Sequence, residues 1–124
     1  MAILESAVQE FNKYLSGFNL PVYDENTVPE EASLPRITYS WAEGEIGYDV
    51  PITVSLWYRS ASWRDITVKA LEIYNALGYG GETLKTDDGY MWIKRGSPFS
   101  SRMTDVQPDI RRIVINFTVE FLRG

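Results

Sequence analysis

The chain has 124 residues and a formal net charge of −5, with 44% apolar, 23% charged and 14% aromatic residues, which is typical of one globular domain rich in sheet or in interface. It has no histidine and no cysteine. This excludes disulfides and thiol- or histidine-based catalysis, so we expect neither an enzyme nor a bound cofactor or metal. Because the chain has no cysteine, a reducing compartment fits better than secretion. No apolar run is long enough to cross a bilayer and the first residues lack a signal-peptide pattern, so we expect no membrane partner.

The first element in chain order is a helix over residues 2–16, followed by the helix-stopping Gly17. Its apolar residues recur at helical spacing and form a stripe of Leu4, Val8, Phe11 and Leu15. The next stretch, Leu20 to Pro35, is rich in proline and acidic residues. It predicts an irregular connection with a short extended piece at Pro21–Tyr23.

Two strands follow. Arg36–Trp41 and Ile52–Tyr58 both alternate between two sets of side chains, which is typical of half-buried strands. Pro51 stands at the start of the second strand, where a proline does least harm. The stretch between them, Ala42–Asp49, contains two glycines and predicts a turn or a loose hairpin end.

The second helix begins after Ser62, because Ser62 and Asp65 have capping-box spacing, with Asp in place of the usual Glu or Gln. Gly78 ends the helix. The stripe predicted to face the core comprises Ile66, Ala70, Ile73 and Leu77. The other face carries charged residues, so we expect this stripe to be core and not a partner surface.

The last third predicts a hairpin and a long final strand. Leu84-Lys85 and Tyr90–Arg95 flank the turn sequence TDDG, and Ile113–Phe121 alternates. The order of elements favours one α+β domain over residues 1–124. We expect a mostly antiparallel β-sheet, with two helices packed on one face and a long loop, Gly96–Asp109, before the last strand.

Three motifs suggest chemistry but have simpler interpretations. GYGGE, at Gly78–Glu82, follows a helix, whereas a phosphate-binding loop precedes one. The acidic residues of the stretch 24–31 lack the spacing of a calcium loop. Asn116-Phe117-Thr118 matches a glycosylation acceptor but lies inside a predicted strand. We therefore expect a helix end, a solvated acidic loop and a strand.

The loop Gly96–Asp109 is the first candidate site. It is longer than a hairpin connection and rich in Gly and Ser, yet it carries isolated apolar residues beside basic ones. We predict a loop that is mobile in the free subunit and ordered by a partner, with Arg95, Phe99, Arg102 and Met103 as the binding residues. The alternative is an ordered loop folded over the sheet edge, with Phe99 buried in its own subunit.

Charge segregation gives the second candidate site. The acidic patch comprises Glu43, Glu45 and Asp49, and the basic patch comprises Lys94, Arg111 and Arg112 together with the loop arginines. Opposite patches on one chain favour a head-to-tail interface that closes into a ring. The alternatives are pairing within one subunit and plain solvation. Trp57 and Trp63 are candidate exposed aromatics, either on a partner surface or covered by a neighbouring element.

Four segments together resemble a known family: LPRITYSW, SLWYRSASWRDITVKALEIYNALG, DDGYMWIKRGSPFSSRM and RRIVINFTVEFL. They are similar to the small tail-terminator or head–tail joining proteins of long-tailed bacteriophages and prophages, of which the lambda tail terminator is one type. The likeness extends from about Leu34 to Leu122 and contains no catalytic motif.

The resemblance implies a non-enzymatic α+β protein that forms a ring, expected to be hexameric, on the tail tube. The ring would stop tube polymerisation and join tail to head. Its partners would be other copies of itself, the tail-tube protein and a head-completion or connector protein, with DNA only passing through the lumen. It would be assembled in the bacterial cytoplasm and reside in the neck of the virion. The alternatives are another neck protein, a small cytosolic ligand- or peptide-binding module, and an enzyme that uses carboxylates.

Overall fold

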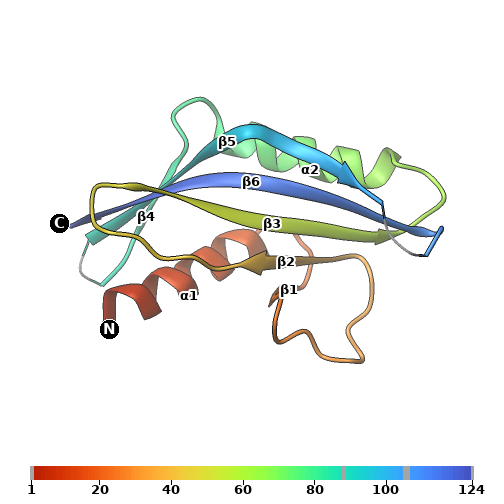
Figure 1. Cartoon of the computed structure of the whole chain (residues 1–124), viewed down its shortest axis with the longest axis horizontal. Coiled ribbons are helices and arrows are strands. Elements are labelled where there is room, and N and C mark those ends of the chain that lie inside the picture. The colour runs from red at the N-terminus through yellow and green to blue at the C-terminus, as the bar shows by residue number, and fades with distance from the viewer. Residues whose placement is uncertain (1, 88, 105–106, 124) are drawn as a thin grey trace.

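The computed structural model describes residues 2–87, 89–104 and 107–123, without the side chains of residues 2–5, and shows two helices and one curled sheet (Figure 1). The elements are α1 (Ala2–Ser16), β1 (Val22–Asp24), β2 (Arg36–Ser40), β3 (Asp49–Arg59), α2 (Arg64–Leu77), β4 (Glu82–Lys85), β5 (Gly89–Met103) and β6 (Ile110–Arg123). The predicted α+β class is confirmed. The side chain of Leu4, Asp88 of the expected TDDG turn and Asp105 of the expected loop lie outside what is described.

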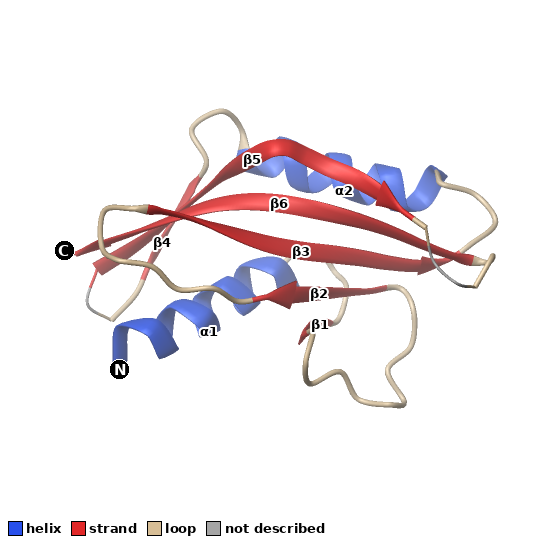
Figure 2. Cartoon of the chain, viewed as in Figure 1, coloured by secondary structure: helices blue, strands red, loops and turns tan. Residues whose placement is uncertain are grey.

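The sheet has the strand order β1-β2-β3-β6-β5-β4, with β1 parallel to β2 and the other neighbouring pairs antiparallel. The central strands β3 and β6 pair from Asp49 opposite Glu120 to Arg59 opposite Ile110. Figure 2 shows β3, β6 and β5 side by side along the long axis of the molecule. Because side chains alternate along each strand, one face of this sheet carries the core and the other carries mostly polar residues.

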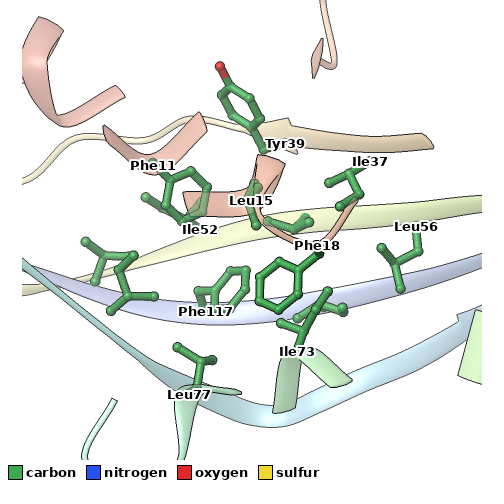
Figure 3. Close-up of a cluster of buried hydrophobic side chains, with 14 of the residues drawn as sticks. Phe11, Leu15, Phe18, Ile37, Tyr39, Ile52, Leu56, Ile73, Leu77 and Phe117 are labelled. Atoms are coloured by element: carbon green, nitrogen blue, oxygen red, sulfur yellow. The ribbon is translucent and has the colours of Figure 1, made fainter. Parts of the chain in front are cut away.

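The core combines the alternate residues of β6 with one face of each helix. On β6 the buried residues are Ile113, Ile115, Phe117, Val119 and Phe121, as the alternation predicted. On α2 they are the predicted Ile66, Ala70, Ile73 and Leu77. Figure 3 shows side chains of both helices in one cluster with Phe117. That both helices pack on one face of the sheet stays a prediction.

The ends of α2 differ in how well the sequence predicted them. Gly78 ends the helix as expected, with φ of 64° and its N–H donating to the Tyr74 carbonyl at 3.3 Å. The predicted capping box was wrong, because the N-cap residue is Trp63, which makes no side-chain cap hydrogen bond. Ser62 lies one residue too early, and its hydroxyl accepts a hydrogen bond from the Arg64 N–H at 3.0 Å.

The predicted long loop was also wrong, because residues 96–103 are the second half of strand β5. The Gly and Pro residues of this stretch form a bulge, since Arg95 pairs with Phe117 but Ser100 already pairs with Ile115. A side chain on Gly96 would place its Cβ 2.6 Å from the Asn116 carbonyl oxygen. The bulge therefore requires glycine there and keeps the strand paired to β6.

Candidate interaction surfaces

Arg95, one of the predicted partner-binding residues, is used inside the fold. Its Nε and one terminal nitrogen donate to the Tyr74 carbonyl at 3.1 and 2.8 Å, in the last turn of α2. The guanidinium carbon also lies 3.4 Å from the centroid of the Tyr74 ring. A cation at a helix C-terminus is favourable because the helix dipole leaves partial negative charge there, so the Tyr74 carbonyl accepts from Arg95 as well as from the Gly78 N–H. Arg95 thus ties β5 to the end of α2.

Phe99 is likewise turned inward. It is half-buried and packs edge-on against Tyr74 and Phe117, with ring centroids 5.1 and 6.3 Å away. This arrangement matches the alternative in which Phe99 is buried in its own subunit. The other two predicted residues, Arg102 and Met103, are exposed at the end of β5, and the Arg102 guanidinium lies 4.8 Å from the Trp63 ring centroid.

The basic patch residues also contact their own chain. Lys94 Nζ lies 3.0 Å from Asp49 and 3.5 Å from Glu120, so the acidic and basic stretches meet within one subunit at this point. Arg111 donates to the carbonyls of Pro108 and Ala61.

Trp57 belongs to the polar face of the sheet. Its indole N–H donates to the Thr38 hydroxyl at 2.9 Å, and the Arg112 guanidinium lies 4.6 Å from its ring. Arg112 in turn donates to the Ser55 hydroxyl. Each of these side chains is therefore already placed by contacts in its own chain. Their role between subunits stays a prediction.

An apolar groove of about 420 Å³ lies between α2 and the second half of β5. Its walls include Thr67, Leu71 and Tyr74 on α2 and Phe99, Ser100 and Arg102 on β5. On the same helix Leu71 is 55% and Val68 57% exposed. This surface was not predicted from the sequence, although Leu71 and Val68 are apolar and lie off the inward stripe, which is the signal that marks them.

The connection between β2 and β3 presents the remaining acidic patch residues. Glu43 and Glu45 are exposed, and beside them Ile46 is 40% and Tyr48 66% exposed. The connection is held to the sheet where β6 ends, because the Gly47 N–H donates to the Phe121 carbonyl at 2.9 Å. An apolar and acidic surface is therefore displayed at a fixed place.

Three titratable groups among the described residues have a shifted pKa. Burial raises the pKa of Tyr14 to about 12 and also raises the pKa of Tyr58, so both phenols stay neutral near pH 7. A hydrogen bond from Arg59 lowers the pKa of Asp109, which stays charged. General acid–base catalysis requires a pKa near the working pH, and none of these three shifts moves in that direction.

Fold and surfaces thus define a small α+β domain that displays an apolar groove and an acidic connection. Within the described part of the chain, neither helix is long and apolar enough to cross a membrane, and no three acidic side chains gather as metal ligands would.

By sequence, the chain matches no protein-family model and no curated protein. By fold, it is similar to a chain of the structure described as "Virion of native gene transfer agent (GTA) particle". The match covers 99% of this chain and 96% of that chain, with a TM-score of 0.62 and 17% sequence identity. At this identity the likeness establishes a common fold over essentially the whole length of both chains.

Proposed function

We propose that this protein is a non-enzymatic structural component of a phage-like virion. In this proposal it forms a ring on the end of the tail tube, stops the polymerisation of the tube and joins the tail to the head. The observation that carries the proposal is the likeness in fold, over 99% of this chain, to a chain of a gene transfer agent virion. The resemblance of four sequence segments to tail-terminator proteins favours the same class.

The physical character of the chain supports this function. Stopping a polymer and joining two assemblies requires surfaces and no catalytic group, and the exposed features described above are apolar and charged surfaces. A net charge of −5 also suits a ring through which DNA passes, because an acidic wall repels the phosphates and does not retain them. The proposed partners are further copies of this chain, a tail-tube protein, and a head-completion or connector protein.

Tube assembly in the presence and absence of the protein tests the proposal. The tail-tube protein of the same virion is polymerised alone or with purified protein, and tube lengths are measured by negative-stain electron microscopy with gold-labelled antibody against this chain. We expect shorter tubes and label at one end only. Native mass spectrometry of the capped tubes' end complexes gives the ring size, expected to be six.

Two outcomes contradict the proposal in different ways. Unchanged tube lengths with no end label would remove the capping function. A ring that binds the head connector but leaves tube length unchanged would identify a different neck protein. Protein added to finished tubes is the matched control, because it should label the ends without altering their length.

A further inference from the structure

We propose that the acidic connection of one copy, residues 42–48, docks into the groove between α2 and β5 of the next copy. This inference rests on the proposed function, since it names the contact by which the ring would close. Each surface is exposed and carries apolar side chains. They belong to different elements of the chain, since the connection joins β2 to β3 and the groove lies between α2 and β5, and Figure 2 shows these elements apart.

The groove is bounded by an edge of the sheet that is unpaired within the described residues. Strand β4 pairs with Tyr90–Ile93 only, and no described strand pairs with the outer side of β5 beyond that point. An uncovered strand edge presents free N–H and C=O groups and is a template for pairing with another chain. The bulge shortens the regular part of this edge to Ser100–Met103. The open edge and the groove beside it therefore accept a short segment of another chain.

The apolar residues beside this edge also favour a segment of another chain as the ligand. Leu71 lines the groove on the exposed side of α2 and is more than half exposed, and Phe99 and Tyr74 line it as well. Removing apolar surface from water stabilises a contact and offsets part of the cost of association. Apolar side chains from a second copy would supply this burial.

Charge selects the occupant. Among the described residues that line the groove, Arg102 is the charged one, and it is exposed. The connection 42–48 brings Ile46 and Tyr48 as apolar side chains, with Glu43 and Glu45 next to them. Complementary charges fix the register of a contact more than its strength, because exposed ion pairs contribute little to stability. Arg102 with the two glutamates would therefore orient the docking.

The two surfaces differ from each other, so their contact is heterologous. Such contacts build a closed ring when the rotation between copies permits it, whereas two identical patches would build only a dimer. The connection is fixed to its own sheet by Gly47 and is packed tightly at Gly44 against Val50. It is therefore presented to a neighbour at low entropic cost.

Disulfide trapping tests the contact directly, because the chain has no cysteine of its own. The double variant Tyr48→Cys with Leu71→Cys is mixed under mild oxidation and analysed on non-reducing gels. We expect a ladder of covalent oligomers beyond the dimer that collapses on reduction. Each single variant should give dimers at most. The matched control, Tyr48→Cys with Gln9→Cys, replaces an exposed residue of α1 and should also give no ladder.

A charge exchange gives a second measurement on assembled rings. Arg102→Glu and Glu45→Arg should each reduce the ring population at least tenfold in native mass spectrometry, and the double exchange should restore it. Circular dichroism of the monomers is the folding control, and it should be unchanged.

The outcomes separate the docking contact from the proposed function. Tube capping by the unaltered protein without a Tyr48–Leu71 ladder, or with as strong a ladder in the Gln9 control, overturns the docking and leaves the capping ring. Trapping of Leu71→Cys by a cysteine variant of the tube protein, and not by Tyr48→Cys, also overturns it. Loss of both capping and the ladder overturns the two proposals together.

Discussion

Replacing Arg95 with Ala is expected to destabilise the monomer, because the structure places this arginine inside the fold. Its two N–H groups share the Tyr74 carbonyl, and a hydrogen bond to a charged group contributes about 1.5–3 kcal/mol. Stacking on the Tyr74 ring adds about 0.5–1 kcal/mol, and a cation at a helix C-terminus about 0.3–1 kcal/mol. These contributions overlap because one guanidinium makes all of them. We expect a loss of about 2–3 kcal/mol.

For a domain of this size, such a loss lowers the melting temperature by about 8–12 °C, at roughly 4 °C per kcal/mol. Thermal and urea unfolding followed by circular dichroism measure it. Arg102→Ala is the matched control on the same strand and should cost no more than about 1 kcal/mol, because that side chain is exposed and lies over the Trp63 ring. Equal stability of the two variants, with tube capping lost only in Arg95→Ala, would refute this reasoning and restore Arg95 as a partner-binding residue.

Three further predictions concern stability. Ile73→Ala should lower the free energy of unfolding, measured in urea, by about 2–5 kcal/mol because Ile73 is fully buried. Val68→Ala on the same helix should change it by no more than about 0.5 kcal/mol because Val68 is exposed, and equal losses would mean that α2 faces the other way. Tyr14→Phe should not destabilise the protein at pH 7, because the buried Tyr14 hydroxyl has no hydrogen-bond partner among the described residues. Burial raises the pKa of Tyr14 to about 12, so the neutral phenol's contribution to the free energy of unfolding is complete below pH 10 and is lost between about pH 10 and 12. Tyr14→Phe should therefore make the free energy of unfolding fall less steeply with pH in this alkaline range. Arg59 lowers the pKa of Asp109, so the charged carboxylate stabilises the fold above the ordinary Asp pKa, and this stabilisation is lost as the pH falls. Asp109→Asn should remove that part of the acid unfolding curve, and an unchanged curve would contradict this prediction.

The bulged second half of β5 changes what a deletion would mean. A loop over 96–109 that only binds partners could be shortened without affecting the fold. The structure instead pairs Ser100–Met103 with β6 and packs Phe99 against Phe117. Removing residues 97–103 is therefore expected to unfold the domain, so point substitutions at exposed positions such as Leu71 are the informative ones.

The sequence by itself determined the parts of the fold that periodicity encodes. The bounds of α1, the inward stripe of α2 and the alternation of β6 all follow from apolar spacing, because each element buries one face only. The sequence also predicted that the helix ends at Gly78, because a helix end in the left-handed region favours glycine. These are local relations, and they hold in nearly any tertiary setting.

Only the tertiary structure decided what residues 94–103 do. The Gly, Ser and Pro content of residues 96–103 indicates a loop. The neighbouring β6 nevertheless supplies hydrogen-bonding partners, and the bulge places Phe99 against Phe117 in the core. Whether a charged side chain is free or used also depends on distant residues: Lys94 meets Asp49, and Arg95 meets the end of α2, across tens of residues. The groove beside Leu71 exists for the same reason, because β4 is too short to cover the edge of β5. Contacts between segments far apart in the chain produce no periodic pattern in the sequence. The sequence therefore showed which residues are charged or apolar but not which of them remain exposed.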